Sequence, residues 1–148
     1  MREAAQWLVD IGKPMWNLED LSPVKINNPS DEFIVMWIDE ESVAAMTLSF
    51  EDRFFWPHVA LNTSGFIHKL SIRRKFAGKG YAEMLIGHAK KLCLAKSIYY
   101  LRLDCDPHRK GLTNFYENCG FSLVELKTIS TKKLGTIDLA MYEMNFIY

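Results

Sequence analysis

Runs rich in apolar residues mark three short segments in the first half of the chain as strands. Residues 33–38 are apolar throughout, the mostly apolar residues 43–50 follow after the polar turn 39–42, and residues 66–72 form the next β-like run. Runs of this length, bounded by turn residues, are typical of β-strands. We expect residues 33–50 to form an antiparallel hairpin, with Phe33–Ile38 as a central strand covered on both faces.

A helical period begins at residue 79. The apolar residues of this segment recur at helical spacing and predict a helix over Lys79–Lys96: Ala82, Leu85, Ile86, Ala89, Leu92 and Cys93. Shorter helices are expected over residues 4–12, 15–21 and 112–118, further strands over 98–104, 121–126 and 136–146, and loops over 27–31 and 51–64. Because strands and helices interleave, the sequence predicts a single α/β domain, residues 1–148, with a mixed central sheet flanked by helices.

Composition and charge narrow the function classes. The 148 residues are 49% apolar and carry 18 basic and 18 acidic side chains, so the net charge is zero. A neutral chain argues against nucleic-acid binding and against electrostatic adsorption to a membrane. There is no apolar run of about 18 residues that would cross a bilayer, and the amphipathic N-terminal segment is not a signal peptide. The three cysteines form no CxxC pair, which favours reduced thiols in the cytoplasm.

The segment between the strand 66–72 and the long helix carries the clearest chemical signal. Residues 73–82 read RRKFAGKGYA, a basic turn with glycines directly before a helix N-terminus. Glycine lets the backbone approach a ligand closely, and the helix end adds unpaired N–H donors, so the turn suits a phosphate group. The GxxxxGK[ST] spacing fails, because Arg73 replaces the first glycine and Gly80 the hydroxyl residue. GxGxxG fits poorly, because Glu83 would face a pyrophosphate.

Two motifs together resemble the GNAT N-acetyltransferase superfamily. Residues 77–82 (AGKGYA) are similar to that family's [QR]-x-x-G-x-[GA] turn, except that Ala77 replaces Gln or Arg. Residues 99–104 (YYLRLD) look like its next strand, and residues 115–121 (FYENCGF) like its [LFY]-Y-x-x-x-G-F signature. The resemblance implies a mixed, mostly antiparallel central sheet of the acyl-CoA N-acyltransferase type. The family usually opens with a strand before the first helix, and that strand is expected to be missing here.

The resemblance further implies that acetyl-CoA is the cofactor. Its pyrophosphate would be held by the backbone and charges of the turn, namely Lys75, Ala77, Gly78, Lys79, Gly80, Tyr81 and Ala82. Its pantetheine arm would pair like a strand with Leu70, Ser71 and Ile72, and the Leu70 N–H would polarise the thioester carbonyl. An ordinary basic strand–helix turn and plain sheet pairing are the alternative interpretations of these two segments.

Three residues are candidates for proton transfer. Tyr116 matches the family's general-acid position, where a phenol protonates the departing thiolate; alternatively, it only packs beside its aromatic neighbours. His68 and Asp104, each near the end of an expected strand, are candidate general bases. Each of these two residues alternatively makes a structural hydrogen bond, and some family members use only water.

The loop 51–64 is expected to border the acceptor. Asp52 would hold an amine and Trp56 would stack on the substrate, although Trp56 alternatively closes the edge of the core. The four histidines show no short ligand spacing, so no metal site is expected.

The sequence therefore predicts a cytoplasmic enzyme that transfers an acetyl group from acetyl-CoA to a primary amine of a small molecule or peptide. A non-catalytic acyl-CoA-binding module or sensor is the alternative. A homodimer is compatible with the family, whereas nucleic-acid and membrane partners are not expected.

Overall fold

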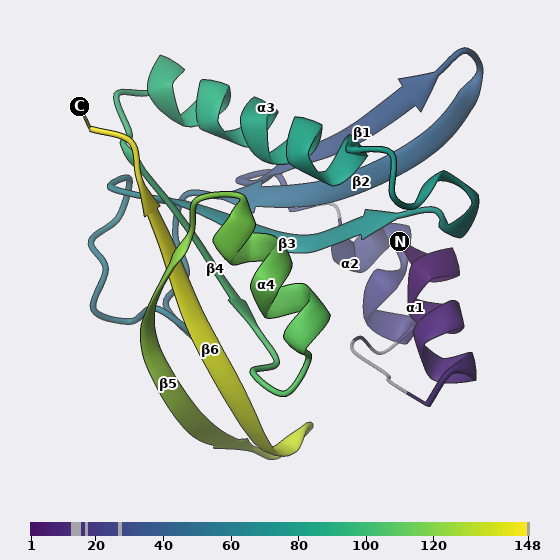
Figure 1. Ribbon diagram of the computed structural model, residues 1–148. Helices are drawn as coiled ribbons and strands as arrows, with labels where there is room; N and C mark the ends of the chain where they lie inside the picture. Colours follow the sequence, from purple (N-terminus) through teal and green to yellow (C-terminus); the bar gives the residue numbers. More distant parts are fainter. Residues whose placement is uncertain (13–15, 17, 27, 148) are drawn as a thin grey trace.

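A single six-stranded sheet with helices on both sides organises the computed structural model, which describes residues 1–12, 16, 18–26 and 28–147 (Figure 1). The helices are α1 (Arg2–Asp10), η1 (Leu18–Leu21), α2 (Pro23–Ile26), η2 (Arg74–Phe76), α3 (Tyr81–Ala95) and α4 (Lys110–Asn118). The strands are β1 (Glu32–Ile38), β2 (Glu41–Ser49), β3 (Gly65–Ile72), β4 (Tyr100–Cys105), β5 (Ser122–Thr131) and β6 (Gly135–Asn145). Within the described residues, none of the helices combines the length and apolar character needed to cross a membrane.

The strand order is β1-β2-β3-β4-β6-β5. All neighbouring strands are antiparallel except β3 and β4, which are parallel. This confirms the mixed, mostly antiparallel sheet expected from the sequence. In the described part of the chain α1 is the first element, and no strand precedes it.

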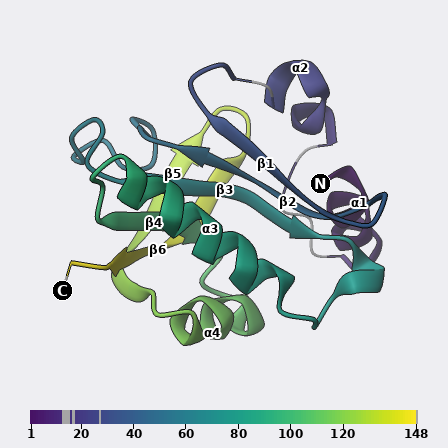
Figure 2. The same cartoon turned by 90° about the horizontal axis from the view of Figure 1, so that it is seen from above.

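Helices α3 and α4 lie on one side of the strands and α2 on the other (Figure 2). The α3 residues predicted to face the core do so, since Leu85, Ile86, Ala89 and Cys93 are buried. They pack in one apolar cluster with alternate residues of β4, which buries Leu101, Leu103 and Cys105. A second cluster contains Trp56, Phe66, Leu139 and Met141.

The prediction that Phe33–Ile38 is a central strand covered on both faces is wrong. β1 forms one edge of the sheet and pairs only with β2, so Phe33 is 48% and Trp37 61% exposed. An apolar run fixes the strand but not its place in the sheet, which depends on partners distant in the sequence. The predicted helix 15–21 and loop 27–31 fall partly outside the described residues, and the short helix α2 was not predicted.

The junction of β3 and β4 is short. Only Gly65 pairs with Leu101 and Phe66 with Arg102, after which the two strands diverge (Figure 1). The end at which β3 and β4 are paired is tightly packed, because a Cβ atom added to Gly65 would lie 2.5 Å from the Cys93 Sγ. Glycine at position 65 therefore lets α3 and β4 approach β3 where the strands are still paired.

We expect Gly65→Ala to lower the free energy of unfolding by about 1–3 kcal/mol, because the new methyl group overpacks the β3–β4–α3 junction. Urea denaturation measures the change. Gly87→Ala on α3 is the control: a Cβ there meets nothing within 4 Å, so it should raise stability by about 0.5–1 kcal/mol through helix propensity. Equal effects of the two substitutions would contradict the tight junction.

Candidate active site

A cleft of about 780 Å³ includes the facing parts of β3 and β4 among its walls. β3 contributes residues 67–72, and the chain from the end of β4 into α4 contributes residues 103–106, 108, 109, 112 and 116. The start of β6 and the inner face of α1 complete the wall. The pantetheine-pairing residues expected from the sequence, Leu70, Ser71 and Ile72, therefore lie along this cleft.

The glycine turn has the backbone conformation that an anion site requires. Gly78 and Gly80 have φ values of +74° and +81°, a region that disfavours side chains, and Gly80 is the residue that precedes the first turn of α3. No atom lies within 4 Å of where a Cβ would stand at either glycine, so the turn is open to a ligand. Unpaired N–H donors at the start of α3, together with the helix dipole, favour a phosphate group there.

Several basic residues of the turn already contact other side chains of the protein. Lys75 forms an ion pair with Glu41, and Arg73 pairs with both Glu41 (2.8 Å) and Glu3 (2.9 Å). The guanidinium of Arg74 lies 4.3 Å from the centre of the Trp7 ring. These contacts tie α1 to the turn, and they engage Lys75, which the sequence assigned to the pyrophosphate.

β3 contains a bulge beside the cleft. The register of β2 and β3 shifts between the pair Ala45–Ser71 and the pair Thr47–His68, which inserts one extra residue in β3. Lys69 takes up the bend with a φ of +53°, a left-handed conformation that is uncommon for lysine. A bulge turns the following peptide group away from the regular ladder, and the following residue is Leu70.

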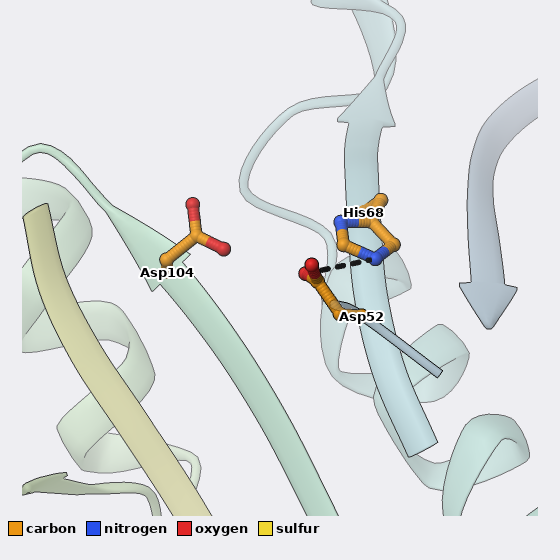
Figure 3. A group of neighbouring side chains, drawn as sticks. All are labelled: Asp52, His68 and Asp104. Carbon is orange, nitrogen blue, oxygen red and sulfur yellow. Dashed lines mark ion pairs between the residues drawn. The ribbon is translucent and has the colours of Figure 1, made fainter. Parts of the chain in front are cut away.

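Three of the polar residues singled out in the sequence converge at the cleft (Figure 3). His68 lies on β3, Asp104 near the end of β4, and Asp52 on the loop after β2. One ligand atom from each falls within 4.8 Å of the others, and the His68 Nε2 is 3.7 Å from the Asp52 Oδ2. Sequence spacing did not reveal this group, because 52, 68 and 104 belong to different elements.

The environment shifts the pKa values of two of these groups in opposite directions. Burial, aided by the negative charge of Asp52, raises the pKa of Asp104 to about 6. Burial lowers the pKa of His68, and the charge of Asp52 offsets this only in part. At pH 7 a neutral imidazole and a carboxylate therefore stand side by side, and both can accept a proton.

Tyr116 lies on the face of α4 that lines the cleft, and 8% of its surface is exposed. Burial is the main cause that raises its pKa above the ordinary tyrosine value, followed by the negative potential of Cys105 and Asp104. The phenol is therefore fully protonated near neutral pH. Its ring also packs edge-on against Phe115 and Phe121, so the packing role considered from the sequence is present as well.

Trp56 and the loop before β3 differ in part from their predicted roles. Trp56 is buried in the second apolar cluster, and its neighbour Phe55 lines the cleft instead. Sequence reasoning also missed His108 and Asp138, which pair at 2.9 Å and line the cleft from the turn before α4 and from β6. Their positions 30 residues apart gave no signal, because the β4–β6 pairing brings them together.

An anion-binding turn, an open parallel strand edge and proton-accepting groups in one cleft are the parts needed for acyl transfer from coenzyme A. The sequence comparisons agree. A sequence model of the Acetyltransferase (GNAT) family matches residues 1–121, and the chain belongs to this family.

Named relatives and solved structures support the same family. The N-acetyltransferase YesJ of Bacillus subtilis (strain 168), itself uncharacterized, is 27% identical over 128 residues, which cover 81% of this chain and 71% of YesJ. Streptothricin acetyltransferase of Escherichia coli is also 27% identical over 128 residues, covering 82% and 70%. A Bacillus anthracis str. Ames protein assigned as a streptothricin acetyltransferase, solved with acetyl coenzyme A, has a TM-score of 0.67 at 18% identity. That match covers 82% of this chain and 65% of the other.

Solved structures of the same fold hold acetyl-CoA or CoA. Acetyl-CoA is therefore the cosubstrate that fits the family, the fold and the anion-binding turn of this chain.

The raised pKa of Asp104 predicts a stability effect with a definite sign. Its folded value of about 6 lies above the ordinary 3.8, so the unfolded chain loses the proton first and stability falls as pH rises through this window. At pH 7 the charged Asp104 costs up to about 3 kcal/mol. Asp104→Asn should therefore stabilise the protein by about 1–3 kcal/mol at pH 7 and leave it nearly unchanged at pH 4, measured by urea unfolding.

Asp39→Asn in the exposed β1–β2 turn is the matched control and should change stability by less than about 0.5 kcal/mol at both pH values. A destabilising effect of Asp104→Asn at pH 7 would contradict the burial of an uncompensated carboxylate at this position.

Proposed function

We propose that this protein transfers the acetyl group of acetyl-CoA directly to a primary amine of a small-molecule or peptide acceptor. The observation that carries the proposal is the cleft between β3 and β4. It lies along an open strand edge, and its walls include His68 and Asp104, with the Asp52 carboxylate beside them. In this proposal residues 1–148 form one acetyltransferase domain that acts in the cytoplasm.

In this proposal β3 receives the cofactor as a neighbouring strand would. β4 leaves β3 after Phe66, so backbone groups between Ile67 and Ile72 lack a partner from β4. Buried backbone N–H and C=O groups require hydrogen-bond partners, and the amides of a pantetheine arm supply them. The bulge at Lys69 would direct the Leu70 N–H toward the thioester carbonyl, where developing negative charge is stabilised.

The pyrophosphate would then rest on the turn from Ala77 to Ala82. The open, left-handed glycines and the start of α3 provide N–H donors. Lys79 adds a positive charge, and Lys75 contributes if its side chain turns from Glu41 to the phosphates. Because Ala77 has no polar side chain, backbone donors carry a larger share of the binding.

The acceptor amine arrives as an ammonium ion and must lose a proton before it attacks. Asp104 and His68 both line the cleft. The pKa of Asp104 is raised to about 6 and that of His68 is lowered, so at pH 7 Asp104 is a carboxylate, His68 is neutral, and either can accept that proton. Asp52 adds negative charge that favours a cationic acceptor. The amine nitrogen forms the new bond to the acetyl carbon, and the carbon–sulfur bond of the thioester breaks.

Tyr116 would act on the departing sulfur as a hydrogen-bond donor. Its raised pKa keeps the hydroxyl protonated, but it also makes the phenol a weaker acid than a free thiol of pKa about 8.5. Tyr116 would therefore donate a strong hydrogen bond to the departing sulfur, which leaves as a thiolate and takes its proton from solvent. Loss of this donor should slow the reaction without abolishing it.

We expect Tyr116→Phe to lower kcat by about 100-fold, the range for one acid or oxyanion donor, with little change in the KM for acetyl-CoA. Free thiol release measures turnover. The acceptor panel contains a streptothricin, since a relative is named for it, together with polyamines, aminoglycosides and peptides with free N-termini. Tyr99→Phe, at a tyrosine that is 41% exposed, is the control and should retain full activity.

Unchanged kcat in Tyr116→Phe would remove Tyr116 from the mechanism. A wild-type protein that binds coenzyme A but releases no thiol with any amine would favour the alternative function, an acyl-CoA-binding module.

A further inference from the structure

Asp52 is a buried carboxylate with one unsatisfied oxygen. Its side chain is 7% exposed. The Oδ1 accepts hydrogen bonds from the backbone N–H groups of Phe54 (3.1 Å) and Phe55 (2.9 Å), which hold the side chain in place. The Oδ2 has no hydrogen-bond partner and points toward His68 (Figure 3). Burying a charged oxygen without a hydrogen-bond donor destabilises the fold, and a bound cation would remove this destabilisation.

The spacing between Asp52 and His68 does not fit a hydrogen bond. Their Oδ2 and Nε2 atoms are 3.7 Å apart, beyond the usual limit for an N–H···O contact. Two ligand atoms at 2.0–2.2 Å from one tetrahedral metal ion are separated by about 3.3 Å. The observed spacing is within a few tenths of an ångström of that value.

Asp104 completes a group of three ligands. Its carboxylate lies within 4.8 Å of the ligand atoms of Asp52 and His68, and it approaches from β4 on the opposite wall. The nearby Lys127, whose ammonium donates to the Phe55 carbonyl, offsets the negative charge at Asp104 only in part. The two carboxylates therefore leave net negative charge for a cation, and the ligands come from three separate elements.

We propose that Asp52, His68 and Asp104 form a binding site for a divalent transition-metal ion such as Zn²⁺ or Co²⁺. One imidazole nitrogen with two carboxylate oxygens is a ligand set that these ions accept, whereas Mg²⁺ and Ca²⁺ prefer oxygen alone. Three protein ligands leave at least one coordination position, and this position faces the cleft because His68 and Asp104 line it.

Metal binding would also regulate the enzyme, a consequence that rests on the proposed function. The ion would occupy His68 and Asp104, the groups that accept the proton of the amine. It would also place positive charge where a cationic acceptor binds. Acetyl transfer would therefore be inhibited by micromolar Zn²⁺ and restored by a chelator, while binding of coenzyme A at the glycine turn would be unaffected.

The test is a titration of the full chain with Co²⁺ alone, followed by visible absorption and by calorimetry. The wild-type protein should bind one Co²⁺ with a tetrahedral or five-coordinate spectrum. Asp52→Asn keeps an oxygen for the Phe54 and Phe55 N–H groups but removes the charge, and His68→Gln removes the imidazole. Each should weaken Co²⁺ binding by about 100-fold or more, since loss of even an outer partner costs 10–100-fold.

His88→Gln, at an exposed histidine of α3, is the control and should bind Co²⁺ as the wild type does. Circular dichroism and coenzyme A affinity report whether each variant is folded, and Asp104→Asn replaces any variant that is not. The proposal is overturned if the wild type shows no Co²⁺ spectrum, or if the three site variants bind Co²⁺ as tightly as His88→Gln. Because no acetyl acceptor is involved, this result is independent of whether the amine acetylation proposed above is correct.

Discussion

The early parting of β3 and β4 is the constraint on which the site depends. Two residue pairs, from Gly65 and Phe66, hold the strands together at one end. The packing of Gly65 against Cys93 and Leu101 fixes that end, so the strands separate in the other direction. Separation leaves backbone groups of β3 without a partner in the sheet, and such groups need a ligand or water. The cleft is thus a consequence of sheet geometry.

The same geometry explains why unfavourable charges are tolerated. The loop after β2 brings Asp52 to His68, and β4 brings Asp104 within reach of both. Burial, together with the negative charge of Asp52, raises the pKa of Asp104 to about 6 and destabilises the folded state at neutral pH. The fold is less stable at neutral pH because of Asp104, but the same group of residues can bind protons or cations.

The ion pairs of Arg73 with Glu3 and with Glu41 connect α1, a wall of the cleft, to the glycine turn.

Local patterns were sufficient to predict the six strands and the helices α1, α3 and α4, although not α2, and two motifs were sufficient to predict the family. The helical period after residue 79 and the glycine turn depend on neighbours along the chain, and both were predicted close to their observed positions. The edge position of β1 and the parting of β3 from β4 depend on long-range pairing, which leaves no local signature. The approach of Asp52 to His68 depends on the Asp52 hydrogen bonds to Phe54 and Phe55, which follow no period. For the same reason the sequence did not show that Trp56 packs in the second apolar cluster while Phe55 lines the cleft.

The central claim is that acetyl-CoA occupies the place that β4 vacates beside β3. Amide hydrogen exchange with and without acetyl-CoA tests it most directly, because exchange reports the hydrogen bonding of each backbone N–H. We predict slower exchange in residues 69–72 and 78–82 when acetyl-CoA is added, and unchanged exchange in β5, on the far edge of the sheet. Two results would contradict this account: exchange that slows at the glycine turn but stays unchanged in β3, or exchange that slows mainly in β5.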